Sequence, residues 1–152
     1  EETLMLEYQI AEAGIREIQF ELPKSLQTAR IGIPAGLLQR KKIEPAMNNS
    51  ILVTLSLQDD VTESLNVIVE HDRLLTDQVQ DVAIPRSLTG TTSQRLVVIE
   101  NTGRDEVVEV RRTGLEPLTR QQQAWQDVLR LLGARAIRSR RRMSASATTR
   151  RA

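Results

Sequence analysis

Two stretches near the N-terminus alternate apolar and polar side chains with the period of a β-strand. Leu4, Leu6, Tyr8 and Ile10 alternate with Met5, Glu7 and Gln9, and Ile18, Phe20 and Leu22 alternate with Glu17, Gln19 and Glu21 before Pro23. A helix over residues 7–22 needs apolar residues three and four apart, but here they scatter around its circumference. Gly14 lies where a turn needs conformational freedom. The pattern predicts a β-hairpin, or two strands joined by a short bend.

The same period returns further along the chain. Residues 51–57 and 65–69 alternate on either side of the turn sequence QDDVTES, which predicts the clearest hairpin. RLVVIE and VVEV predict a third strand pair around Asn101 and Gly103. ARIGIP predicts a short strand that ends at Pro34. QDVAIP is a further run, which Pro85 closes. Residues 35–48 favour no particular element.

Strand follows strand without intervening helices, which is typical of an antiparallel β-sandwich rather than a parallel α/β sheet. We therefore expect a mainly β fold with a sandwich over residues 1–118, and a partly open barrel is the alternative. The positions central to their strands are expected to be buried: Ile18, Phe20, Val53, Leu55, Val67, Val69, Val98 and Val108.

The pattern changes to a helical one at residue 119. Trp125, Val128, Leu129 and Leu132 follow helical spacing, Thr119 and Gln122 fit a capping box, and Gly133 fits a C-terminal stop. This predicts an amphipathic α-helix over residues 119–133. Residues 134–152 have no apolar stripe and are rich in Arg, Ser, Thr and Ala, which predicts a disordered tail.

The charged residues are distributed unevenly along the chain. Seven of the 21 basic residues lie in the tail, which has no acidic residue, so the remaining chain carries 14 basic against 20 acidic groups. A basic tail therefore follows an acidic body. Cysteine is absent, which excludes disulfides and thiolate metal sites and leaves the redox compartment open. No apolar run is long enough to span a membrane.

Candidate catalytic chemistry is sparse. His71 is the single histidine, and no GxSxG, HExxH or phosphate-loop pattern accompanies it, so we expect no catalytic residue and no cofactor. Asp59, Asp60 and Glu63 offer oxygen atoms that Ca²⁺ could accept and are the candidate metal ligands. Their spacing matches no known loop, so we expect solvated turn carboxylates there.

Two groups of basic residues are candidates for binding polyanions. Arg40, Lys41 and Lys42 form a short cluster that an exposed loop would explain. The tail can contact phosphates or anionic lipid through Arg135, Arg138, Arg140, Arg141, Arg142, Arg150 and Arg151. No aromatic side chain lies among these arginines to stack on bases, which disfavours nucleic acid as a partner.

LEYQIAEAGIREIQFELP, ILVTLSLQ, LNVIVEHDR, DVAIP, and RLVVIENTGRDEVVEV followed by GLEPL together resemble β-sandwich modules of large multi-domain exported or membrane-anchored bacterial proteins. The resemblance covers about residues 4–118, although the region from 24 to 50 is more compact than the fuller pattern. It implies a structural or interaction role outside the cytoplasm, in the periplasm, at the cell surface or anchored to a membrane, and it supplies no catalytic residues.

The sequence thus favours a noncatalytic β-sandwich module that contacts neighbouring domains of the same polypeptide or other proteins. Because the chain begins on a strand-like run, we expect it to be part of a larger protein. The alternatives are a carbohydrate- or ligand-binding module, an enzyme whose site another domain completes, and binding to nucleic acid or an anionic surface through the basic tail.

Overall fold

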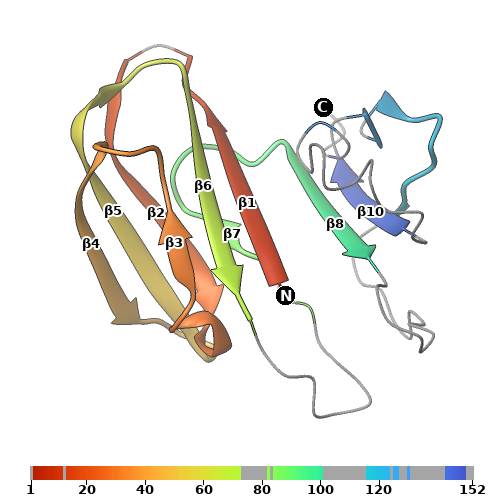
Figure 1. The fold of residues 1–152 in the computed structure, drawn as a ribbon, viewed down its shortest axis with the longest axis horizontal. Coiled ribbons are helices and arrows are strands. Elements are labelled where there is room, and N and C mark those ends of the chain that lie inside the picture. The colour runs from red at the N-terminus through yellow and green to blue at the C-terminus, as the bar shows by residue number, and fades with distance from the viewer. Residues whose placement is uncertain are drawn as a thin grey trace. The chain divides into compact units, whose positions relative to one another are not determined.

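The computed structural model describes residues 2–11, 13–72, 82, 84–100, 116–123, 125–126, 130 and 143–149. The chain divides into two compact units, an N-terminal unit, Glu1–Thr91, and a C-terminal unit, Thr92–Ala152. Figure 1 shows that strands dominate both. The strands are β1 (Glu2–Gln9), β2 (Ile15–Pro23), β3 (Arg30–Gly32), β4 (Leu38–Pro45), β5 (Ser50–Val61), β6 (Ser64–His71), β7 (Arg86–Ser87), β8 (Gln94–Glu100), β9 (Glu116–Pro117) and β10 (Met143–Thr149).

The N-terminal unit contains two antiparallel sheets. The first has three strands in the order β1-β6-β3, and the second has four in the order β4-β5-β2-β7. In the described residues these sheets stay separate and do not close into a barrel. The predictions of a mainly β fold and of antiparallel pairing are confirmed, and the described strands form no closed barrel.

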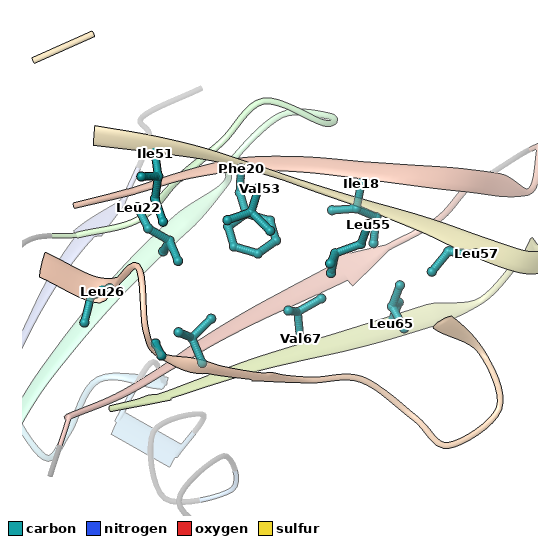
Figure 2. Close-up of a cluster of buried hydrophobic side chains, with 12 residues drawn as sticks. Ile18, Phe20, Leu22, Leu26, Ile51, Val53, Leu55, Leu57, Leu65 and Val67 are labelled. Carbon is teal, nitrogen blue, oxygen red and sulfur yellow. The ribbon is translucent and has the colours of Figure 1, made fainter. Parts of the chain in front are cut away.

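Strand register places the apolar side chains in matched pairs on the facing sides of the two sheets. In the four-stranded sheet, β2 and β5 pair Ile18 with Leu55, Phe20 with Val53 and Leu22 with Ile51. In the three-stranded sheet, β1 and β6 pair Leu4 with Val69, Leu6 with Val67 and Tyr8 with Leu65. Figure 2 shows the side chains of β2 and β5 directed toward Val67 and Leu65 of β6. One core therefore holds both sheets together.

Burial follows this alternation. Ile18, Phe20, Val53 and Leu55 are 0% exposed, Val67 is also 0% and Val69 is 1%, so six of the predicted core positions are confirmed. The side chain of Val98 and the whole of Val108 lie outside the described residues. Among the described residues no polar or charged residue is buried, so the fully buried side chains of the core are all apolar.

Strand pairing differs from the prediction. β1 pairs with β6 and β2 pairs with β5, so the expected hairpin of residues 51–57 and 65–69 does not form. Each connection, from β1 to β2 and from β5 to β6, instead carries the chain from one sheet to the other. β1 and β2 do not pair with each other, and a short bend joins them, so for these two strands the alternative to a hairpin is confirmed. Gly14 lies in that bend, where an added Cβ would lie 2.7 Å from Cβ of Asp60.

The hairpin that does form joins β4 to β5, in a region where the sequence predicted no particular element. Asn48 and Asn49 both have positive φ, 55° and 57°, and the Ser50 amide donates to the Met47 carbonyl at 3.2 Å. Two central residues with positive φ define a type I′ turn, which suits the twist of a two-residue hairpin. Asparagine tolerates this left-handed conformation better than most residues do.

Shorter elements complete the N-terminal unit. β3 confirms the strand predicted before Pro34, and a 3-10 helix over Lys24–Leu26 brings Leu26 into the core. In the run QDVAIP, which Pro85 closes, the described residues Val82, Ile84 and Pro85 belong to no strand, and β7 follows them. The chain after β7 is attached to β2, because Leu88 N–H donates to the Gln19 carbonyl at 2.9 Å.

The C-terminal unit contains a three-stranded antiparallel sheet in the order β8-β10-β9. Its central strand, β10, pairs with β8 from Met143↔Glu100 to Thr149↔Gln94. The prediction of disorder over 134–152 is therefore wrong for residues 143–149. Backbone hydrogen bonds to two neighbours can order a strand that has no apolar stripe, and the sequence argument relied on that stripe.

The helix predicted over 119–133 stays a prediction, since the described residues are too few to establish it. Gln122 Oε1 accepts a hydrogen bond from the Thr119 amide at 2.7 Å, which is one of the two bonds of a capping box. Trp125 is 7% exposed, and the Arg120 guanidinium lies 5.9 Å from its ring centroid. The predicted end of the sandwich at residue 118 also stays a prediction, while the compact units divide after Thr91. In the described part of the chain, no helix has the length and apolar character needed to cross a membrane.

Replacement of Phe20 by alanine should destabilise the N-terminal unit by about 3 to 5 kcal/mol, because it removes the largest fully buried side chain and leaves a cavity between the sheets. Denaturant unfolding measures the difference. Gln58→Ala on exposed β5 surface is the control and should change stability by less than about 0.5 kcal/mol. An unchanged midpoint for Phe20→Ala would contradict the assigned core.

Deletion of residues 143–152 should disrupt the C-terminal unit, because it removes the strand between β8 and β9. Hydrogen exchange of the β8 amides measures the loss and should become fast. Deletion of residues 150–152 alone is the matched control, since it leaves β10 whole. Equal protection of β8 in both truncations would restore the prediction of a dispensable tail.

Candidate functional site

His71 ends β6 and has one hydroxyl neighbour in the described structure. Its Nε2 lies 3.4 Å from Thr28 Oγ1, beyond the reach of about 3.2 Å typical of a base that activates a nucleophile. Its Nδ1 is buried and has no hydrogen-bond partner among the described residues, so no carboxylate orients the ring there. The described geometry therefore lacks the base and orienting group of a catalytic triad.

Asp59 and Asp60 lie at the end of β5, and Glu63 lies in the turn to β6. Asp60 Oδ1 accepts a hydrogen bond from Arg16 Nε at 2.7 Å, and this ion pair raises the pKa of Arg16. Within the described ranges, no three histidine or carboxylate side chains converge as metal ligands. Asp60 therefore forms an exposed ion pair that links β5 to the start of β2.

Arg40, Lys41 and Lys42 lie on β4 and not in the exposed loop that the sequence suggested. β4 is an edge strand, and Lys41 is opposite the fully buried Leu55, so its Cβ lies on the core-facing side of the sheet. Lys42 Nζ lies 2.9 Å from Glu44 Oε1. The seven arginines of the predicted polyanion site, Arg135 to Arg151, all lie outside the described residues.

A surface hollow of about 370 Å³ lies at one end of the four-stranded sheet, beside the type I′ turn. It is lined by Glu21, Leu22, Pro23, Asn48, Asn49, Ser50, Ile84 and Arg86. Glu21 is the single carboxylate among the described lining residues, and Arg86 Nη1 lies 3.7 Å from Glu21 Oε2. This lining offers a small polar surface and no pair of carboxylates that could divide acid and base roles.

Tyr8 connects the two sheets. Its hydroxyl lies 3.0 Å from Ser87 Oγ, and Ser87 Oγ itself donates to the Thr89 carbonyl at 2.9 Å. Since a serine hydroxyl has one proton, Tyr8 is the donor in the first bond. Burial raises the pKa of Tyr8, and the hydrogen bond with Ser87 offsets part of that rise. The bond joins β1 of one sheet to β7 of the other.

The edges of the two sheets differ in how they are protected. β4 carries the core-facing Lys41, has a register irregularity between Leu38 and Arg40, and ends at Pro45. β3 and β7 contain three and two residues. Inward charges, bulges, proline and short length all discourage further strand pairing. β1 lacks the last three of these features, since it is eight residues long, regular in register, and without Pro.

The hydrogen-bonding pattern shows which backbone groups of β1 point away from β6. Ile10 N–H donates to the Glu63 carbonyl at 2.9 Å, in register with the β1·β6 ladder. Bonded pairs alternate in an antiparallel ladder, so Leu4, Leu6 and Tyr8 bond to β6, and the odd-numbered residues direct N–H and C=O away from it. No backbone hydrogen bond involving the outward groups of Thr3 or Met5 occurs in the described part of the structure. Thr3 and Met5 therefore direct their backbone groups away from β6, at the outer edge of the sheet.

Comparisons with known protein families, with curated proteins and with solved structures found no match for this chain.

Replacement of Tyr8 by phenylalanine should remove a pH-dependent contribution to stability. The folded state raises the pKa of Tyr8 above its ordinary value of 10.0, so it holds the phenolic proton more tightly than the unfolded state does. This contribution is complete below pH 10.0 and is lost as pH rises through the folded-state pKa.

Thermal unfolding of both proteins at neutral and strongly alkaline pH tests this expectation. The stability of the wild type should fall more steeply above about pH 10 than that of Tyr8→Phe, in which the lysines and arginines titrate equally. Parallel curves for the two proteins would show that Tyr8 ionises as freely in the folded state as in the unfolded one.

Proposed function

We propose that this chain is a noncatalytic structural or interaction module, and that the outer edge of β1 around Thr3 and Met5 is its contact surface. The observation that carries the proposal is the contrast among the sheet edges of the N-terminal unit. β3, β4 and β7 carry features that block pairing, whereas β1 is long and regular. Its partner is an extended protein segment that adds to the sheet through main-chain hydrogen bonds.

Resemblance to β-sandwich modules of exported or membrane-anchored bacterial proteins extends this proposal to a location and a context. In that setting the module belongs to a larger extracytoplasmic protein, and the extended segment comes from a neighbouring domain or another protein. The acidic balance of the chain before its tail is compatible with this setting, because excess charge of one sign keeps the surface soluble.

Carbohydrate binding has less support than strand addition. Sugar sites generally use exposed aromatic rings as platforms. The chain has one Tyr, one Phe and one Trp, and all three are described. Phe20 is 0% exposed, Trp125 is 7% exposed, and Tyr8 is half-buried with its hydroxyl bonded to Ser87. None of these rings lies open on the surface.

The proposed edge can be tested by removing a single backbone donor. Met5 N–H points away from β6, so Met5→Pro deletes an outward donor without breaking the β1·β6 ladder. Met5→Ala is the matched control, since it shortens the side chain and keeps the donor. Both variants should retain the cooperative unfolding of the core.

The probe is a synthetic peptide of about eight residues, the length of β1, with alternating Thr and Val and a lysine at each end. Its binding should slow hydrogen exchange at the Thr3 and Met5 amides of the full chain. Met5→Ala should bind the peptide and Met5→Pro should lose most of the binding. Equal binding by the two variants, or no binding to the wild type, would overturn the proposed edge.

A further inference from the structure

The hollow beside the type I′ turn brings together two opposite charges from strands far apart in the sequence. Glu21 of β2 lies opposite Arg86 of β7, and both lie on the outer face of the four-stranded sheet, because the adjacent Phe20 is buried in the core. Pro23 lies on the same face of β2, two residues further on. We propose that this hollow binds the ammonium and carboxylate groups of a free α-amino acid with an aliphatic side chain. β1 lies in the other sheet, so this inference stands apart from the proposed strand contact.

The walls of the hollow are held in place by backbone hydrogen bonds. Lys24 N–H donates to the Asn49 carbonyl at 2.9 Å, which ties the type I′ turn to the end of β2. On the opposite side, Leu88 N–H donates to the Gln19 carbonyl at 2.9 Å and keeps β7 beside β2. The hollow is therefore formed before a ligand arrives, and binding requires little further ordering of the chain.

The two charges in the hollow form an ion pair without a hydrogen bond. Arg86 Nη1 lies 3.7 Å from Glu21 Oε2. Charge-assisted hydrogen bonds are about 2.7 to 2.9 Å long, as in the 2.7 Å contact between Arg16 Nε and Asp60 Oδ1. The side chain of Glu21 is only 30% exposed, so its carboxylate is partly withdrawn from water. A ligand with charged groups of its own would supply the short hydrogen bonds that this pair lacks.

These charges favour a ligand that carries both signs. An anion that reached Arg86 would also meet the carboxylate of Glu21, and a cation that reached Glu21 would meet the guanidinium. An α-amino acid avoids both conflicts, because its ammonium donates to Glu21 while its carboxylate accepts paired N–H bonds from Arg86. Asn48 and Asn49 line the same hollow, and their side-chain amides can both donate and accept, so they suit either group.

The apolar part of the lining indicates the side chain of the ligand. Pro23 and Ile84 line the hollow and are half-buried, so an aliphatic side chain that covers them would remove apolar surface from water. The volume of about 370 Å³ is at the lower end of the range of roughly 300 to 1,000 Å³ that is typical of small-molecule sites. A single amino acid such as leucine suits this size.

Titration of the full chain with L-leucine, followed by NMR of the backbone amides, tests the site. The amides of Asn49, Ser50 and Arg86 should shift saturably, with a dissociation constant on the order of 1 mM, as expected of a small ligand at an open surface. Leucine amide lacks the carboxylate and isocaproate lacks the ammonium. Each should bind at least about tenfold more weakly, because it loses a charge-assisted hydrogen bond. Equal binding of the three compounds would reject a site for an amino acid.

Variants of the two charged residues locate the binding. Arg86→Gln and Glu21→Gln each remove one charge on the outer face of the sheet, and each should weaken leucine binding by at least about tenfold. Arg16→Gln is the matched control, since it removes an arginine from an exposed ion pair that does not line the hollow, and it should bind leucine as the wild type does. A wild type without saturable shifts around the hollow, or equal losses in Arg86→Gln and Arg16→Gln, would overturn the proposed site.

Discussion

The N-terminal unit depends on one constraint, which is that its two sheets must present apolar faces to each other. Phe20 and Val53 form the middle pair on one face, and Leu6 and Val67 form the corresponding pair on the other. Because only alternate residues point inward, a slip of one residue in either ladder would expose the whole apolar set of a strand. In the described part of the chain the fully buried side chains of this core are apolar, and Phe20 is the one aromatic among them, so shape and register determine its packing.

The period of two in the sequence was enough to locate β1, β2, β5 and β6 and to name their buried residues, but not to pair them. Alternation shows that a strand has one apolar face, and it is the same whether the next strand lies beside it or across the core. For this reason residues 51–57 and 65–69 read as a hairpin although β5 and β6 belong to different sheets. The bend at Gly14 and the turn at Thr62 and Glu63 are short in both arrangements, so loop length offered no distinction.

β4 was missed for a physical reason that also bears on function. A strand at a sheet edge has one side open to water, so it can place Lys41 on its core-facing side, and this interrupts the apolar alternation by which strands are recognised. β10 was missed for a related reason, since ladder bonds to β8 and β9 rather than an apolar stripe define it. The sequence also could not identify the edge of β1 as a candidate site. Which strand lies at an edge depends on strand order, and the alternation did not predict strand order.

The same sheet geometry explains why some edge strands carry features that discourage strand pairing and why β1 lacks most of them. Wherever a sheet ends, its last strand presents unpaired backbone groups, and β4 carries the charges and irregular register that keep such groups from pairing with another chain. β1 differs because it is long and regular, with uncharged residues at the outward positions Thr3 and Met5, while Leu4, Leu6 and Tyr8 stay half-buried. Because the other edge strands carry features that discourage pairing and β1 is regular, the edge of β1 is the one suited to the proposed additional strand. The half-burial of Leu4, Leu6 and Tyr8 indicates which face of that strand must be apolar.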